Sequence, residues 1–98
     1  MINKPAKWHS DKYIKFLKSQ KCCRCEKVPP CEVHHLRKFT DGGTGLKPSD
    51  AYGLPVCREC HGTMQRYEQD EGNVSVLVWR YNQCLKYLIE WLAGEDNE

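Results

Sequence analysis

The sequence predicts an α+β fold in a single domain spanning residues 1–98. Three observations support this fold class: two well-separated C-x-x-C pairs, two short apolar segments typical of strands, and helical patterns before and after them. A chain of this length buries only a modest core, so it commonly needs disulfides or a metal ion for stability. The cysteines therefore decide how such a fold is held together.

The number and spacing of the cysteines favour metal over disulfides. Seven is an odd count, and the polar, basic N-terminus carries no export signal, so we expect a cytoplasmic protein with reduced thiols. Two C-x-x-C pairs can supply four thiolates to one tetrahedral structural Zn²⁺. The four expected zinc ligands are Cys22, Cys25, Cys57 and Cys60. Cys23 and Cys31 are alternatives to Cys22, whereas Cys84 lies in a helical pattern that predicts a small buried hydrophobe.

The charge is distributed unevenly along the chain. Residues 1–49 hold eleven Lys or Arg and four Asp or Glu, a net charge of +7. Residues 50–98 hold four against nine, a net charge of −5. The basic half can face nucleic-acid phosphates, or it can be an ordinary solvated surface, and charge alone leaves both open. No apolar run reaches the roughly 18 residues that a membrane span needs.

The first elements are an arm and a helix. Residues 1–9 predict a loose basic arm, although Trp8 should dock somewhere. Ser10 and Asp11 offer an N-cap for a short helix that runs to about Gln20. Residues 10–70 then contain the zinc knuckles and a two-strand-and-helix core.

Two strands and a loop follow the first knuckle. The segment 32–36 alternates weakly and predicts a strand that carries His34 and His35. Neighbouring side chains on a strand point to opposite faces, so these two histidines are expected to do different work. The glycine-rich loop at 40–45 lacks the Gly-Lys-Ser/Thr ending of a nucleotide-binding loop. Residues 54–56 predict the second strand.

Two helices complete the chain. The first is expected over about 60–69, where His61 and Gln65 are four residues apart and share a face. The second is expected over 73–93, with Gly94 as its C-terminal stop and residues 95–98 as a disordered tail. The apolar stripe expected to pack across the zinc core comprises Val74, Leu77, Val78, Tyr81, Leu85, Leu88 and Leu92. A neighbouring face carries Trp79, Tyr87 and Trp91.

The histidines suggest phosphodiester chemistry. If zinc joins the two C-x-x-C turns, His34, His35 and His61 come close together. A divalent metal on His34 and His61 can neutralise phosphate oxygens and stabilise a leaving 3′-oxygen. A neutral His35 outside the metal sphere can take a proton from water as general base. Arg37, on the same strand face as His35, can hold a phosphate oxygen.

This pattern resembles the HNH (ββα-metal) nucleases with paired zinc knuckles, and more closely the small phage and prophage HNH proteins related to phage recombination-enhancement nucleases. The resemblance covers about residues 8–66. The matching stretches are Trp8-x-Ser10-x-x-Tyr13, Cys22-x-x-Cys25, His34-His35-Leu36-Arg37, Gly42-Gly43-Thr44-Gly45-x-Lys47-Pro48-x-Asp50 and Pro55-Val56-Cys57-x-x-Cys60-His61.

The resemblance implies a DNA endonuclease with His35 as general base and a catalytic Mg²⁺ or Mn²⁺ on His34 and His61. Two positions depart from the family pattern. Tyr52 stands where the middle asparagine is expected, so another residue such as Asp50 must orient the base. Gln65 stands where the last His or Asn is expected, and its amide oxygen can still serve as a ligand.

The expected partner is DNA, with specificity supplied by DNA structure or by a protein such as a recombinase. The chain itself is expected to be a monomer or a weak dimer. One alternative is a non-catalytic Cys₄ zinc module that binds DNA through the basic half. Another is a protein-interaction adaptor that uses a face with Trp79 and Trp91. A redox C-x-x-C enzyme is disfavoured, because metal would quench the thiol chemistry.

Overall fold

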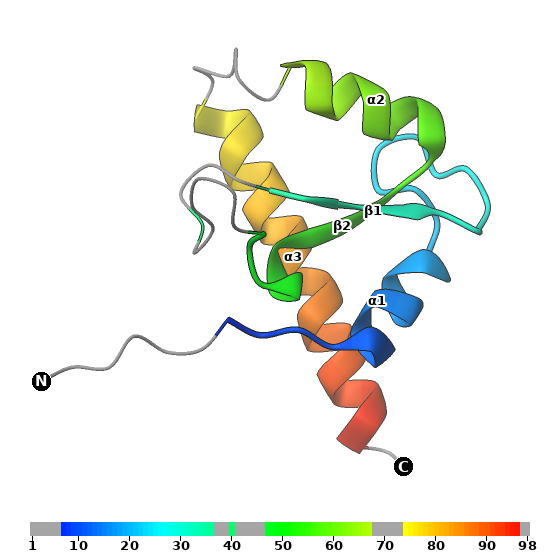
Figure 1. Ribbon diagram of the computed structural model, residues 1–98, viewed down its shortest axis with the longest axis vertical. Coiled ribbons are helices and arrows are strands. Elements are labelled where there is room, and N and C mark those ends of the chain that lie inside the picture. The colour runs from blue at the N-terminus through cyan, green and yellow to red at the C-terminus, as the bar shows by residue number, and fades with distance from the viewer. Residues whose placement is uncertain (1–6, 37–39, 41–46, 68–73, 97–98) are drawn as a thin grey trace, which may run out of the picture.

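A computed structural model describes residues 7–36, 40, 47–67 and 74–96 of the chain. It confirms the α+β class: one two-stranded sheet is surrounded by three helices and a short 3₁₀ turn (Figure 1). The elements in chain order are α1 (Asp11–Lys18), β1 (Glu32–His35), η1 (Asp50–Tyr52), β2 (Gly53–Val56), α2 (Arg58–Tyr67) and α3 (Val74–Asp96).

Helix α1 begins where the sequence predicts and ends two residues earlier. The Ser10 hydroxyl caps it by accepting the backbone N–H of Tyr13 at 3.1 Å. At the other end, the Ser19 hydroxyl donates to the Phe16 carbonyl at 2.6 Å. Because such a side chain competes for the carbonyl that the next helical turn needs, α1 ends at Lys18 rather than Gln20.

The β-hairpin is the centre of the fold. Strands β1 and β2 pair antiparallel, with His34 opposite Leu54 and His35 opposite Gly53. Every residue of β2 is buried, and Leu54 and Val56 are fully so. Helices α1, α2 and α3 all contact this strand, and Figure 1 shows α3 passing behind the hairpin. The order β1–β2–α2 follows the predicted strand–strand–helix arrangement.

Helix α3 packs with a face that only partly overlaps the predicted one. Its buried side carries Arg80, Cys84 and Tyr87, with Trp91 partly buried beside them. Of the predicted stripe, Tyr81 and Leu88 are partly buried and pack against the core. Three other members of the stripe are exposed, namely Val78, Leu85 and Leu92, as are Trp79 and Ile89. The helix is apolar around much of its circumference, so periodicity alone does not select the buried face. Contacts of the large aromatic side chains determine which face of α3 is buried.

The aromatic contacts explain this choice. Trp8, Tyr13 and Trp91 form a cluster with ring centroids 5.2 to 5.8 Å apart. Tyr13 is fully buried within it. Trp8 therefore docks as expected, and the described part of the expected loose arm, residues 7–9, is held against the core rather than free. Residues 1–6 lie outside the described part.

The C-terminal boundary of α3 also differs from the prediction. The helix continues through Gly94 to Asp96, so the predicted stop at Gly94 is wrong. A glycine ends a helix most readily when an apolar residue after it packs back onto the last turn. Here the residues that follow Gly94 are Glu95 and Asp96, and neither is apolar. α3 is 23 residues long. None of the helices among the described residues combines the length and apolarity that crossing a bilayer requires.

Gly53 provides a test of how tightly the hairpin packs. A Cβ at this position would lie 2.8 Å from Val33 Cγ1 and 3.1 Å from both the Asp50 carbonyl and Leu17 Cδ1. We expect Gly53→Ala to lower the free energy of unfolding by roughly 1–3 kcal/mol through overpacking. Gly94→Ala is the control, because a Cβ there meets nothing within 4 Å and alanine favours helix. Urea unfolding of the zinc-loaded proteins measures both, and equal midpoints would contradict the prediction.

Candidate functional site

Four cysteines converge at one end of the hairpin. Cys22 and Cys25 lie in the turn after α1, Cys57 follows β2, and Cys60 lies in the first turn of α2. Their sulfur atoms all lie within 4.8 Å of one another, and those of Cys25 and Cys57 are 3.6 Å apart. Zinc–sulfur bonds of about 2.3 Å in a tetrahedron place sulfurs about 3.8 Å apart. The predicted ligand set is therefore brought together, and its chemistry suits a structural metal such as zinc.

The backbone of both turns is arranged around the sulfurs. In the first turn, the Glu26 N–H donates to the Cys22 carbonyl at 2.9 Å, and Glu26 adopts a φ of 63°. That left-handed conformation lets the chain reverse within a few residues. In the second turn, the Cys60 N–H donates to the Cys57 sulfur at 3.5 Å. The Arg24 guanidinium lies 3.7 Å from the Cys60 sulfur and offsets thiolate charge there.

The thiols of the cluster ionise unequally. Burial opposes ionisation of Cys22, yet backbone N–H groups of Cys57 and Cys25 face its sulfur and lower its pKa to about 6. Burial raises the pKa of the Cys60 thiol to about 12, although Arg24 works in the other direction. Four thiolates this close together repel one another, so full ionisation of the cluster requires a bound cation.

The other three cysteines are separate from this cluster. Cys31 and Cys84 are buried, and Cys23 is partly buried. Burial raises the pKa of Cys23 and of Cys84 to about 12, so both remain protonated at neutral pH. The metal-ligand group found among the described residues contains Cys22 rather than Cys23 or Cys31. The alternative ligands considered from the sequence are therefore not the ones the fold brings together.

Two histidines face each other between β1 and α2. The rings of His34 and His61 have centroids 5.2 Å apart, in an edge-to-face arrangement. His34 is 3% exposed, and His61 lies at the more open side of the pair. The Cys₄ cluster explains this proximity, because Cys57 and Cys60 fix the start of α2 directly beside β1.

A carboxylate orients His61. Glu32 Oε1 lies 2.8 Å from His61 Nδ1, and Glu32 is the first residue of β1. With Nδ1 donating to this carboxylate, the lone pair of His61 is on Nε2. A carboxylate that fixes the tautomer of an imidazole in this way is typical of histidines that bind metal. Glu32 was not a candidate from the sequence, although its place two residues before His34 on the same strand was a usable signal.

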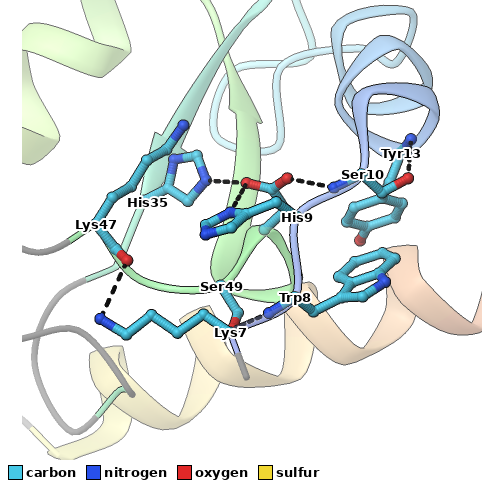
Figure 2. Close-up of polar contacts among 9 residues, drawn as sticks. Lys7, Trp8, His9, Ser10, Tyr13, His35, Lys47 and Ser49 are labelled. Atoms are coloured by element: carbon cyan, nitrogen blue, oxygen red, sulfur yellow. Dashed lines mark hydrogen bonds and ion pairs between the residues drawn. The ribbon is translucent and has the colours of Figure 1, made fainter. Parts of the chain in front are cut away.

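His35 lies against a buried carboxylate on the other side of β1. His35 Nε2 is 2.9 Å from Asp50 Oδ1, and both side chains are largely buried (Figure 2). Burial lowers the pKa of His35, although the hydrogen bond to Asp50 acts against this. Burial tends to raise the pKa of Asp50, but hydrogen bonds from His35 and the Ser10 N–H outweigh it and lower that pKa. At neutral pH the pair is a neutral imidazole that donates Nε2–H to a carboxylate, which leaves Nδ1 as an acceptor.

The N-terminal segment completes the surroundings of Asp50. The Ser10 N–H donates to Asp50 Oδ2 at 2.7 Å, and His9 Nδ1 lies 3.6 Å from Asp50 Oδ1. The Asp50 N–H in turn donates to the Trp8 carbonyl at 2.8 Å. His9 was not a candidate from the sequence, because no spacing rule connects residues 9 and 50. Only the docking of Trp8 brings the two together.

The remaining predicted site residues have mixed outcomes. Tyr52 stands at the position expected for asparagine. Its backbone carbonyl accepts a hydrogen bond from the Leu36 N–H at 3.0 Å. Asp50, suggested as the substitute, does contact His35. Gln65 lies on α2, but its side chain is not among those described, so its role as a ligand stays a prediction. Arg37 lies outside the described residues.

Metal content provides a direct test of the cysteine assignment. We expect one tightly bound zinc per chain, measured by atomic emission on protein purified without added metal. Cys57→Ser should lose it and unfold, because removing a ligand from a structural site removes folding free energy. Cys23→Ser is the control, since Cys23 lies outside the ligand group. Retention of zinc by Cys57→Ser, or its loss from Cys23→Ser, would contradict the assignment.

The chain is similar to proteins whose activity is not established. Residues 1–86 match the model of a family described as protein of unknown function, DUF968. The uncharacterized protein YdfU of Escherichia coli (strain K12) is 32% identical over 84 residues, which cover 82% of this chain and 24% of YdfU. The chain thus spans about a quarter of the length of this relative. No solved structure matches it. Because the family model covers most of the sequence, the chain belongs to the DUF968 family.

Proposed function

We propose that this protein is a metal-dependent DNA endonuclease with an HNH (ββα-metal) core. The observation that carries the proposal is the pairing of His35 with the buried carboxylate of Asp50, at 2.9 Å, on the strand that also holds His34. A neutral imidazole polarised by a carboxylate is the arrangement that a general base requires. The β1–β2–α2 order and the Cys₄ cluster support the same core.

His35 acts as the base. Asp50 accepts a hydrogen bond from the Nε2–H group of His35, so Nδ1 is the atom that takes a proton from the attacking water. Asp50 then stabilises the imidazolium that forms, as a buried carboxylate does for the histidine of other hydrolases. Because Asp50 itself is held by the Ser10 N–H at 2.7 Å, the ring of His35 has one defined orientation.

His34 and His61 are the candidate ligands of the catalytic ion. Two facing imidazoles, one oriented by Glu32 through a 2.8 Å hydrogen bond, can supply ligands to a divalent metal ion. Mg²⁺ or Mn²⁺ is the ion that the resemblance to the HNH nucleases implies. A divalent ion at this place neutralises charge on the phosphate and on the leaving 3′-oxygen. The roles of Gln65 as a further ligand and of Arg37 as a phosphate contact belong to the same proposal.

DNA is the proposed substrate because the first half of the chain carries a net charge of +7. A recombinase or another DNA-processing protein remains the proposed partner, and a cytoplasmic location the proposed setting. The competing function is a Cys₄ zinc module that binds DNA without cleaving it. That module uses the same cysteines but assigns no role to the Asp50–His35 pair.

Nicking of supercoiled plasmid tests the proposal. With Mg²⁺ or Mn²⁺ added, wild type should nick, and His35→Ala should lose roughly 10²–10⁴-fold in rate, because general-base catalysis contributes about that much. Asp50→Asn should also slow nicking, since an amide does not stabilise an imidazolium. Each variant must retain one zinc. If wild type binds DNA but does not nick it with any divalent ion, the non-catalytic zinc module becomes the better assignment.

Metal affinity tests the role of Glu32. We expect Glu32→Ala to weaken Mn²⁺ binding by roughly 10–100-fold, because loss of a carboxylate partner of a ligating histidine has that effect. Glu32→Gln should recover much of the affinity, since its amide oxygen can accept the same Nδ1–H. Glu59→Ala is the matched control: it removes an equal charge from exposed α2 surface nearby. Electron paramagnetic resonance of free Mn²⁺ gives the affinities of wild type and of the three variants. Equal affinities for Glu32→Ala and Glu59→Ala would exclude the orienting role.

A further inference from the structure

We propose that Lys7, His9 and Lys47 form a phosphate-binding edge beside His35, which holds the backbone of duplex DNA next to the reacting phosphate. This inference rests on the proposed function, because it names the residues that would bind the DNA backbone at the proposed nuclease site. It also brings in the N-terminal segment, which the sequence predicted to be a loose basic arm.

The edge is built by two segments that lie 40 residues apart in the chain. The Trp8 N–H donates to the Ser49 hydroxyl at 2.9 Å, and the Asp50 N–H donates to the Trp8 carbonyl at 2.8 Å. Trp8 is anchored at the same time by its contacts with Tyr13 and Trp91. The backbone from 7 to 10 therefore has a fixed position along residues 47–50, and its side chains have defined neighbours.

This arrangement gathers positive charge around one histidine. Lys7 Nζ lies 3.4 Å from the Lys47 carbonyl, in an exposed contact. Figure 2 shows the Lys47 side chain beside the ring of His35, with the ammonium group of Lys7 at the Lys47 carbonyl. The proximity of Lys47 also acts to lower the pKa of His35. The side chain of His9 is 53% exposed, so its ring borders the same surface.

The nearby negative charge is already engaged. The side chain of Asp50 is 4% exposed, and its oxygens face His35, His9 and the Ser10 N–H. It cannot also neutralise the two lysines at the surface. The ammonium groups of Lys7 and Lys47 thus add positive charge to this surface, and Asp50 does not neutralise it. Such an edge attracts phosphate and repels cations, so it does not suit a second metal.

Duplex DNA fits this edge better than a small phosphate ester. A phosphodiester backbone carries one charge on each successive phosphate, so Lys7 and Lys47 can contact phosphates that flank the one at His35. Contacts of this kind position the backbone and carry no sequence information. They therefore predict binding that depends strongly on salt and weakly on sequence.

The salt dependence of DNA binding tests the edge. Binding of a fluorescent duplex is measured by anisotropy in buffer without Mg²⁺ or Mn²⁺, so that the proposed cleavage does not occur. We compare wild type with the double variant Lys7→Ala/Lys47→Ala across a range of salt concentrations. The magnitude of the negative slope of log association constant against log salt concentration should decrease by roughly two in the double variant. Each lost phosphate contact lowers that magnitude by about 0.9. The affinity at low salt should fall as well.

The matched control is Lys12→Ala/Lys18→Ala, which removes the same charge from exposed positions of α1 in the same basic half of the chain. It should leave the slope unchanged. Equal slopes for the two double variants would overturn the edge, whether or not wild type nicks plasmid. A reduced slope for Lys7→Ala/Lys47→Ala alone supports the edge, even if wild type fails to nick and the proposed hydrolysis is wrong. Absence of DNA binding by wild type would overturn both.

Discussion

The convergence of four thiols at one end of the hairpin is the constraint on which the rest of the structure depends. The first C-x-x-C turn follows α1 and the second joins β2 to α2, so a metal ion held by both would connect three elements at once. The same convergence of the two turns places the start of α2 beside β1 and His61 beside His34. In a chain with a small apolar core, this connection replaces packing area that a larger domain would supply.

Asp50 is the second organising residue. It receives hydrogen bonds from the N-terminal segment through Ser10 and from β1 through His35, while its own N–H reaches the Trp8 carbonyl. A buried carboxylate needs several such partners to remain charged. The same bonds that satisfy it also orient His35 and hold the segment that carries His9. Stability and the geometry of the candidate base thus have one common cause.

The two faces of β1 divide the proposed chemistry. His34 points toward α2 and pairs with His61, whereas His35 points toward η1 and pairs with Asp50. A different carboxylate lies on each side of the strand: Glu32 is hydrogen-bonded to His61 on the side of His34, and Asp50 is hydrogen-bonded to His35 on the other. Alternation along a strand is sufficient to separate a metal side from a proton-transfer side. This is the physical reason why two adjacent histidines can hold different roles.

The sequence by itself determined the α+β class, the four cysteines that can hold a metal ion and the approximate bounds of the elements, because cysteine spacing and local periodicity are properties of short stretches of chain. It also suggested Asp50 as the partner of His35. Tertiary structure alone decided which face of α3 is buried, where that helix ends, and that His9 lies beside the Asp50–His35 pair. These depend on contacts between residues far apart in the chain, such as Trp8 with Trp91, and no local pattern encodes them.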